Sequence, residues 1–178
     1  RLSKDEYYLQ IAHATSRRST CLRRRFGAII VKNDVIVSSG YNGSARGVVN
    51  CNNVGCLKDK LDIPQYEGYD YCIGVHAEEN AVINAARSGN CTLNGVMYIF
   101  GEEVKTNKET EPKPCSRCRR VLINAGIAEI VIKKQKIIHI KTKDWATEDT
   151  ESYIGMLGRE PTSRLEKERN KEEELCPL

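Results

Sequence analysis

Apolar side chains near the start of the chain recur every three or four residues, which is the spacing of one face of a helix. The positions within residues 3–18 that form this stripe are Tyr7, Tyr8, Ile11, Ala12 and Thr15. Ser3 precedes Glu6 by three residues, the spacing of a capping box, in which each side chain bonds to the other residue's backbone amide. The pattern therefore predicts an amphipathic helix over residues 3–18.

Short β-branched runs and further helical patterns alternate through the rest of the chain. The runs that predict strands are residues 26–31, 35–41, 96–100, 128–134 and 137–140. Helical patterns cover residues 76–88 and 115–125, and a glycine follows each of them. Asn33 and Asp34 tolerate a tight turn, so the first two strands are expected to form a hairpin. Strands separated by helices favour an α/β fold with a mixed sheet covered on both faces.

Three segments lack this regular patterning. Residues 42–75 hold five glycines, one proline and three cysteines, and so long an irregular stretch indicates a functional or externally held segment. Residues 101–113 are polar and predict a loop, whereas residues 151–178 form a charged tail, predicted to be a solvated helix or a disordered end. We therefore expect one domain over residues 1–150, followed by this tail.

Composition narrows the class of protein. The 178 residues are 40% hydrophobic and 29% charged, and no apolar run reaches the roughly 18 residues of a membrane span. The first residues lack the apolar core of a signal peptide, so a cytoplasmic location is expected. A net charge of +4 makes a nucleic-acid partner improbable. Eight cysteines in such a chain indicate metal ligands or catalytic thiols rather than disulfides.

Two short motifs carry the chemistry, and each opens a predicted helix. His76 and Glu78 stand at one helix start, and Cys115 and Cys118 stand at the other. A Cys-x-x-Cys at a helix start brings two sulfurs to one ion, and the helix dipole favours thiolates there. One His with two Cys leaves a fourth position open for water, as in catalytic zinc sites. Glu78 would then carry protons between the attacking water and the leaving nitrogen.

His-x-Glu combined with Pro-Cys-x-x-Cys resembles the known signature of the zinc nucleobase deaminases. The chain resembles the cytidine and deoxycytidylate deaminase family over residues 4–135. The segments that carry the resemblance are RSTCLRRRFGAIIV (18–31), GYNG (40–43), CNNVGC (51–56), HAEENA (76–81) and PCSRC with NAGI (114–127).

The resemblance implies a three-layer α/β/α fold with a mixed five-stranded sheet. It implies a hydrolase that converts dCMP to dUMP and ammonia, with zinc held by His76, Cys115 and Cys118. Hydroxide on the zinc would attack C4 while Glu78 takes the water proton, protonates N3 and then protonates the leaving amine. Ala77 would offer backbone contacts to the base.

The same resemblance implies further binding sites and an assembly. Asn42 would lie near the sugar or phosphate of the nucleotide. Effectors, with dCTP activating and dTTP inhibiting, would bind, together with Mg²⁺, at Gly40, Tyr41, Asn42, Gly43 and Arg46. Family members also suggest a homo-oligomer, with a hexamer as the expected size.

Two additional sites rest on less specific patterns. A second, structural zinc is expected on Cys21, Cys51, Cys56 and Cys72, because a loop with few apolar residues needs a cross-link to become ordered. The alternative is that these thiols are small buried hydrophobes. Arg25, with Arg24 beside it, is expected to bind phosphate, against the alternative of a solvated strand edge.

Other functions stay open from the sequence. The same chemistry on guanine, adenine or a base in RNA is the nearest alternative. A zinc-stabilised nucleotide-binding module without turnover would not need Glu78. A thiol redox protein would use Cys115 and Cys118 alone. The long 101–113 segment departs from the family pattern, which commonly has only a couple of residues before the Pro-Cys pair.

Overall fold

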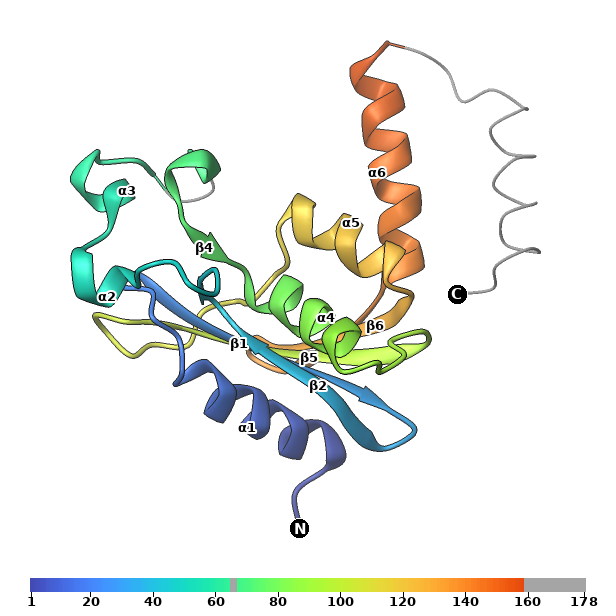
Figure 1. The fold of residues 1–178 in the computed structure, drawn as a ribbon. Coiled ribbons are helices and arrows are strands. Elements are labelled where there is room, and N and C mark those ends of the chain that lie inside the picture. Colours follow the sequence, from blue (N-terminus) through green and yellow to red (C-terminus); the bar gives the residue numbers. More distant parts are fainter. Residues whose placement is uncertain (65–66, 159–178) are drawn as a thin grey trace.

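A five-stranded sheet in the order β2-β1-β5-β6-β7 forms the centre of the computed structural model, which describes residues 1–64 and 67–158 (Figure 1). Strands β5 and β6 are parallel, whereas the other neighbouring pairs are antiparallel. The strands are β1 (Arg24–Lys32), β2 (Val35–Tyr41), β5 (Gly95–Glu103), β6 (Ile127–Lys133) and β7 (Ile137–Lys141). The predicted mixed sheet of five strands is therefore confirmed.

Helices cover both faces of this sheet. The helices are α1 (Lys4–Ser16), α4 (Ala77–Arg87), α5 (Ser116–Asn124) and α6 (Thr142–Met156). Figure 1 shows α1 on one side of the sheet and α4 with α5 on the other. Alternate β1 side chains face the two layers: Ile29 packs with Ala12 of α1, and Ile30 packs in the core that contains Ala81 of α4. The expected three-layer α/β/α arrangement is confirmed.

The first helix begins as predicted but buries a different stripe. Ser3 Oγ accepts from the Glu6 amide at 3.2 Å, and Glu6 Oε2 accepts from the Ser3 amide at 2.9 Å, which completes the capping box. The buried residues are Tyr8, Leu9, Ala12 and Ser16. Tyr7, which the predicted stripe included, is half exposed and its ring lies against Tyr8. The face is thus rotated, because Leu9 is the side chain that packs on the sheet.

A two-residue turn joins β1 to β2. Asn33 and Asp34 have φ angles of 50° and 64°, and two consecutive positive φ angles suit the right-handed twist of a hairpin. The Asp34 carboxylate accepts from the Tyr8 hydroxyl at 2.7 Å and pairs with Lys4 Nζ at 2.6 Å. The turn is therefore also tied to α1, and the predicted hairpin is confirmed.

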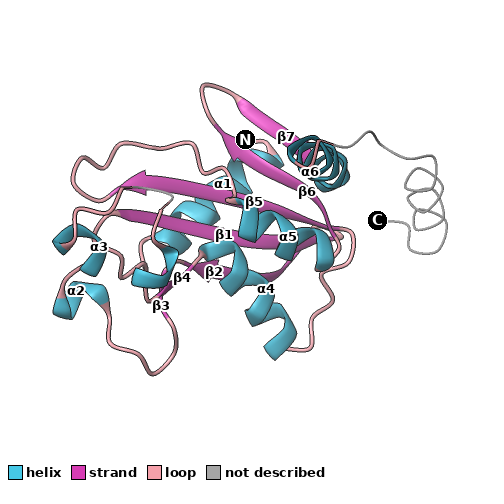
Figure 2. Cartoon of the chain, turned by 90° about the horizontal axis from the view of Figure 1, so that it is seen from above, coloured by secondary structure: helices cyan, strands magenta, loops and turns pink. Residues whose placement is uncertain are grey.

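In its described residues, 42–64 and 67–75, the irregular segment contains only short elements, which lie beside the end of the sheet where β5 ends (Figure 2). These elements are β3 (Gly43–Ser44), α2 (Cys51–Val54), α3 (Leu57–Lys60), a 3₁₀ turn (Tyr69–Tyr71) and β4 (Gly74–Val75). Strands β3 and β4 pair with each other and not with the main sheet. This segment thus adds little regular structure, as its composition predicted, and leads directly into α4.

The predicted loop over 101–113 is partly strand. Strand β5 continues to Glu103, and the chain then folds back along it. The Glu103 amide donates to the Lys108 carbonyl at 3.0 Å, and the Thr110 amide donates to the Gly101 carbonyl at 2.9 Å. Backbone pairing therefore orders a segment whose polar side chains predicted a plain loop.

Helix α6 covers the expected domain boundary at residue 150, and residues 159–178 of the expected tail lie outside the described residues. The boundary therefore stays a prediction. Trp145 anchors this helix in the core, and the Arg119 guanidinium of α5 lies 4.9 Å from the centre of its ring. Among the described helices, none combines the length and the apolar character needed to cross a membrane.

A buried carboxylate joins α1 to the sheet. The Glu102 side chain is 5% exposed, and its Oε1 lies 2.7 Å from Nη1 of both Arg17 and Arg25. Burial by itself would raise the pKa of Glu102, but the hydrogen bonds from Arg25 and Arg17 outweigh burial and hold the pKa below the ordinary value of a glutamate.

Replacing this carboxylate is expected to weaken the fold in a pH-dependent way. Glu102→Gln should lower the free energy of unfolding at pH 7 by about 1–3 kcal/mol, because two guanidinium groups lose their shared partner. A lowered folded-state pKa contributes stability above the unfolded pKa, and this contribution disappears as the pH falls through the folded pKa. Urea unfolding should therefore show the gap between variant and wild type closing at acid pH. An equal gap at neutral and acid pH would contradict this ion-pair role.

Candidate metal centre

The first half of the centre is the start of α4. Strand β4 leads into His76, which has extended backbone angles and forms the N-cap of the helix. The His76 amide donates to Glu79 Oε2 at 3.3 Å, so a side chain of the first turn stabilises the N-terminus of the helix. Ala77 and Glu78 follow in that turn, and both are buried. The N-cap geometry thus places the imidazole and the Glu78 carboxylate at one helix end.

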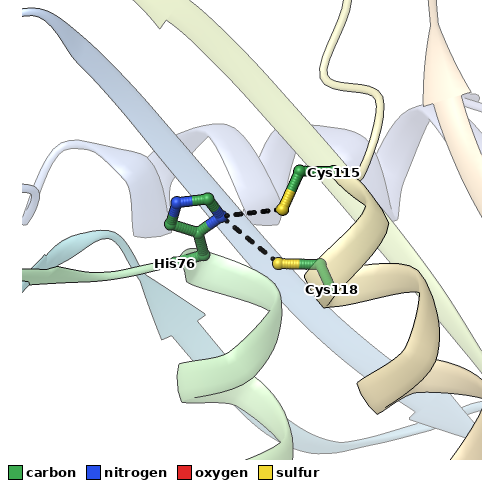
Figure 3. A group of neighbouring side chains, drawn as sticks. All are labelled: His76, Cys115 and Cys118. Carbon is green, nitrogen blue, oxygen red and sulfur yellow. Dashed lines mark hydrogen bonds between the residues drawn. The ribbon is translucent and has the colours of Figure 1, made fainter. Parts of the chain in front are cut away.

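The second half is the start of α5. Cys115 is the N-cap of this helix, and Cys118 lies one turn further on its buried side. Figure 3 shows both sulfurs directed at the His76 ring. His76 Nδ1 lies 3.6 Å from Cys115 Sγ and 3.3 Å from Cys118 Sγ. Two helix starts that are 39 residues apart in the sequence therefore meet at one point.

These three residues fit a zinc ion. Their ligand atoms all lie within 4.8 Å of one another, and in the described part of the chain no other group of three such residues does so. One imidazole nitrogen and two sulfurs form the donor set that zinc prefers, and three protein ligands leave one coordination position free. The sequence prediction of the ligand set agrees with this geometry.

The two thiols have opposite tendencies to ionise. The hydrogen bond from Cys118 and the neighbouring His76 lower the pKa of Cys115 to about 3. The same hydrogen bond, together with burial, raises the pKa of Cys118. The pair by itself thus carries one negative charge easily and resists a second. A divalent cation would favour ionisation of both sulfurs.

Glu78 is the acid–base candidate. Its side chain is buried, and burial raises its pKa, although the nearby His76 opposes this change. A carboxyl group with a raised pKa can both accept and release a proton near neutral pH, which is what general acid–base catalysis requires. Glu78 also lines the pocket that contains His76 and Cys115, so its position suits proton transfer there.

That pocket has a volume of about 480 Å³ and joins the metal centre to the irregular segment. Several predicted site residues line it besides the metal centre: Ala77, Asn42, Gly43, Cys21, Cys51, Cys56 and Cys72. Others do not line it: Arg25, Gly40, Tyr41, Arg46 and the buried Cys118. The structure therefore places some of the predicted site residues on the pocket wall and others outside it.

Arg25 lies on the face of β1 away from the pocket, where it binds Glu102. This geometry does not support a contact between Arg25 and substrate phosphate, which stays a prediction. Side chains alternate along a strand, so the pocket receives the neighbouring Arg24 instead, with its Nη2 3.6 Å from Glu103 Oε1.

Asn42 uses its side chain to hold β1. Its Oδ1 accepts from the Phe26 amide at 2.7 Å, and its Nδ2 donates to the Arg24 carbonyl at 2.9 Å. The amide group thus satisfies backbone groups where β1 begins and β2 has ended. Asn42 faces the pocket in this position, and its contact with a nucleotide stays a prediction.

Gly40 allows α4 to lie directly on β2. A Cβ atom here would overlap the backbone of Ala77 and Ala81 in that helix. Arg46 Nη2 donates to Asn84 Oδ1 at 2.5 Å, and the Asn80 side chain donates to the Tyr41 carbonyl at 2.8 Å. These contacts give the GYNG segment a structural role, and its binding of effectors stays a prediction.

Gly40→Ala is expected to lower the free energy of unfolding by about 1–3 kcal/mol, because the added methyl group must push α4 away from the sheet. Turnover should fall with it, since α4 carries His76 and Glu78. Thermal unfolding and activity measure the two effects. Gly155→Ala is the control, because a Cβ there meets nothing within 4 Å. A Gly40→Ala variant with wild-type stability would contradict the close packing.

Four further cysteines border the same pocket. The pKa of Cys51 is raised mainly by burial. The nearby thiols of Cys21, Cys56 and Cys72 raise it further. The four therefore share one neighbourhood, although they do not form a group with all ligand atoms within 4.8 Å in the described residues.

Several pocket residues were not among the predicted site residues. The Tyr69 ring lies 5.9 Å from the His76 ring, between centroids. In the sequence, Tyr69 alternates with other tyrosines, a pattern that fits packing within a loop as well as stacking on a base. Lys58 lines the pocket and is 8% exposed, and no local pattern distinguished it from other lysines.

Comparisons with known proteins agree with this geometry. The chain matches the family model for the cytidine and deoxycytidylate deaminase zinc-binding region over residues 2–134. It is 33% identical over 133 residues to the deoxycytidylate deaminase of Schizosaccharomyces pombe. The aligned region covers 74% of this chain and 37% of that protein. It is 30% identical over 136 residues to the deoxycytidylate deaminase of Mycobacterium phage D29. This aligned region covers 74% of this chain and 94% of the phage protein. The chain thus spans less than half of the yeast relative.

Solved structures show the same fold. The dCMP deaminase of cyanophage S-TIM5, solved in complex with dCMP and dUMP, is 25% identical with a TM-score of 0.53, covering 74% of this chain and 83% of that one. A cytidine deaminase from Burkholderia pseudomallei is 18% identical with a TM-score of 0.54, covering 80% and 95%. The second likeness is one of fold alone.

Proposed function

The chain belongs to the cytidine and deoxycytidylate deaminase family, and on that basis we propose that it hydrolyses dCMP to dUMP and ammonia. The observation that carries the proposal is the meeting of His76, Cys115 and Cys118 at one point, with the Glu78 carboxyl group buried beside them. Relatives named deoxycytidylate deaminases and the solved complex with dCMP and dUMP support the choice of substrate.

His76, Cys115 and Cys118 would hold the zinc, which when bound supplies a Lewis acid that makes water a nucleophile near neutral pH. Glu78 takes a proton from the attacking water and holds it on its carboxylate. It then gives this proton to N3 of the base. Glu78 next takes the proton of the hydroxyl group added at C4 and passes it to the amine, which leaves as ammonia while the C4 carbonyl of dUMP forms. The Ala77 amide, in the first turn of α4, has no partner within the helix and suits a contact to the base.

The proposal includes a second, structural zinc on Cys21, Cys51, Cys56 and Cys72. Their position around one pocket supports it, as does the scarcity of buried apolar side chains in the elements that they connect. The four sulfurs would have to approach one another to share an ion. Two zinc ions per chain, measured by elemental analysis, are the expected result.

It also includes regulation and assembly. Effectors dCTP and dTTP with Mg²⁺ would bind near the GYNG segment, in a homo-oligomer of six chains in the cytoplasm. Exposed apolar side chains on the irregular segment support a contact between chains. They include Val48, Val49, Val54, Leu57 and Leu61.

The test is ammonia release from dCMP, CMP, deoxycytidine, cytidine and guanine by the purified zinc-loaded chain. Turnover is expected to be fastest with dCMP. Turnover of guanine alone would replace the proposed base, and no turnover of any compound by a zinc-loaded chain would contradict an enzymatic function.

A further inference from the structure

The pocket beside the metal centre has an excess of positive charge on its wall. Apart from Glu78, three carboxylates line it, and each has a cationic partner within 4 Å. The pairs are Asp59 with Arg23 at 3.2 Å, Glu103 with Arg24 at 3.6 Å, and Glu111 with Lys134 at 2.6 Å. These carboxylates therefore add no net negative charge to the pocket.

Three lysines on the same wall have no such partner. Lys58, Lys105 and Lys113 line the pocket, and none of them forms an ion pair within the described residues. Lys58 is the most informative, because it is 8% exposed and its ammonium lies 5.7 Å from the centre of the Tyr69 ring. Because this residue is largely covered and has no carboxylate partner within 4 Å, its ammonium group is available to an anion in the pocket.

The backbone holds the other two lysines in place. The Val104 amide donates to the Arg23 carbonyl at 3.1 Å, so the backbone directly before Lys105 is paired with the start of β1. Lys113 stands between Pro112 and Pro114, both of which are buried. Two prolines restrict the backbone on either side of it, so little ordering is needed when a ligand binds.

We propose that Lys58, Lys105 and Lys113 form a subsite that binds the phosphate group of the substrate. The inference rests on the proposed function, because the lysines line the same pocket as His76 and Glu78. A phosphate carries up to two negative charges and several acceptor oxygens, which three ammonium groups can meet together. The subsite would make the chain select a nucleotide over the corresponding nucleoside.

The test compares kcat/KM for dCMP with kcat/KM for deoxycytidine in single variants. Lys58→Gln and Lys105→Gln should each lower this ratio by about 10- to 100-fold, as expected for one lost charge-assisted hydrogen bond. Lys60→Gln in α3 and Lys108→Gln in the turn after β5 are matched controls, because both lysines are exposed and neither lines the pocket. The controls should keep the wild-type ratio.

Three outcomes would overturn the subsite. One is an unchanged ratio in both Lys58→Gln and Lys105→Gln while the wild type is active. Another is a lower zinc content in Lys58→Gln with an unchanged ratio, which would make this lysine a counter-ion of the cysteines. The third is a lost response to dCTP with an unchanged ratio, which would assign the lysines to an effector.

Binding of product separates failure of the subsite from failure of the proposed function. If the wild type releases ammonia from no cytosine compound, the proposed function has failed, and calorimetry with dUMP and deoxyuridine decides the subsite. Stronger binding of dUMP that is lost in Lys105→Gln supports it. Equal binding of the two ligands, or binding of neither, overturns it.

Discussion

Glu78→Gln is expected to lower kcat for dCMP by about 10²- to 10⁴-fold, which is the usual contribution of a positioned acid–base group. Glutamine has nearly the same shape but can neither accept nor release the proton that must travel from water to the leaving amine. The variant should keep its zinc, since Glu78 is not among the three ligands. Ammonia release and elemental analysis on the same preparation measure the two properties.

Glu79→Gln is the matched control for this substitution. Its side chain caps α4 by accepting from the His76 amide, and a glutamine oxygen can make the same hydrogen bond. Turnover should stay within a few-fold of wild type. Equal turnover in Glu78→Gln and wild type would remove Glu78 from the mechanism and would favour a different proton carrier in the pocket.

Cys118→Ser is expected to abolish turnover and to remove one zinc ion per chain. A serine hydroxyl does not ionise near neutral pH and is a poor replacement for a buried thiolate ligand. Because zinc binding is coupled to folding, Tm should also fall by about 5–10 °C, taking about 2–4 °C for each kcal/mol lost in a domain of this size. Elemental analysis, calorimetry and ammonia release test the three parts.

Cys91→Ser is the control for this ligand variant. Cys91 is exposed and contacts Lys32 Nζ at 3.3 Å, away from the pocket lining. It should keep wild-type zinc content, Tm and turnover. If the chain were instead a thiol redox protein, oxidation of Cys115 and Cys118 would control its activity, and a metal chelator would have no effect. A chelator that abolishes turnover in reducing buffer would exclude that alternative.

The metal centre was predictable because its information is local. Each of the two motifs begins a helix, and the residue spacing within each motif already indicates which side chains share a helix start. The turn at Asn33 and Asp34 was equally readable, because the two residues tolerate the positive φ angles that they adopt.

Sequence patterns were less informative where the outcome depends on packing. Arg24 and Arg25 are adjacent in a basic run, and composition does not distinguish them. Only the pleat of β1 decides that Arg24 reaches the pocket while Arg25 meets the carboxylate of Glu102. In the same way, the docking of α1 on the sheet selected Leu9 over Tyr7 for the buried face.

The sequence by itself therefore determined the five strands of the main sheet and the helices α1, α4 and α5, together with the motifs of the candidate metal centre, because these depend on short-range spacing and turn chemistry. It did not predict helix α6, which Trp145 anchors in the core. The tertiary structure alone decided which side chains share the pocket, because that depends on how β1, α3 and the turn after β5 meet in space. The three lysines of the proposed subsite span 55 positions of the sequence, from Lys58 through Lys105 to Lys113. No local pattern connects them, and folding places them around one cavity beside His76.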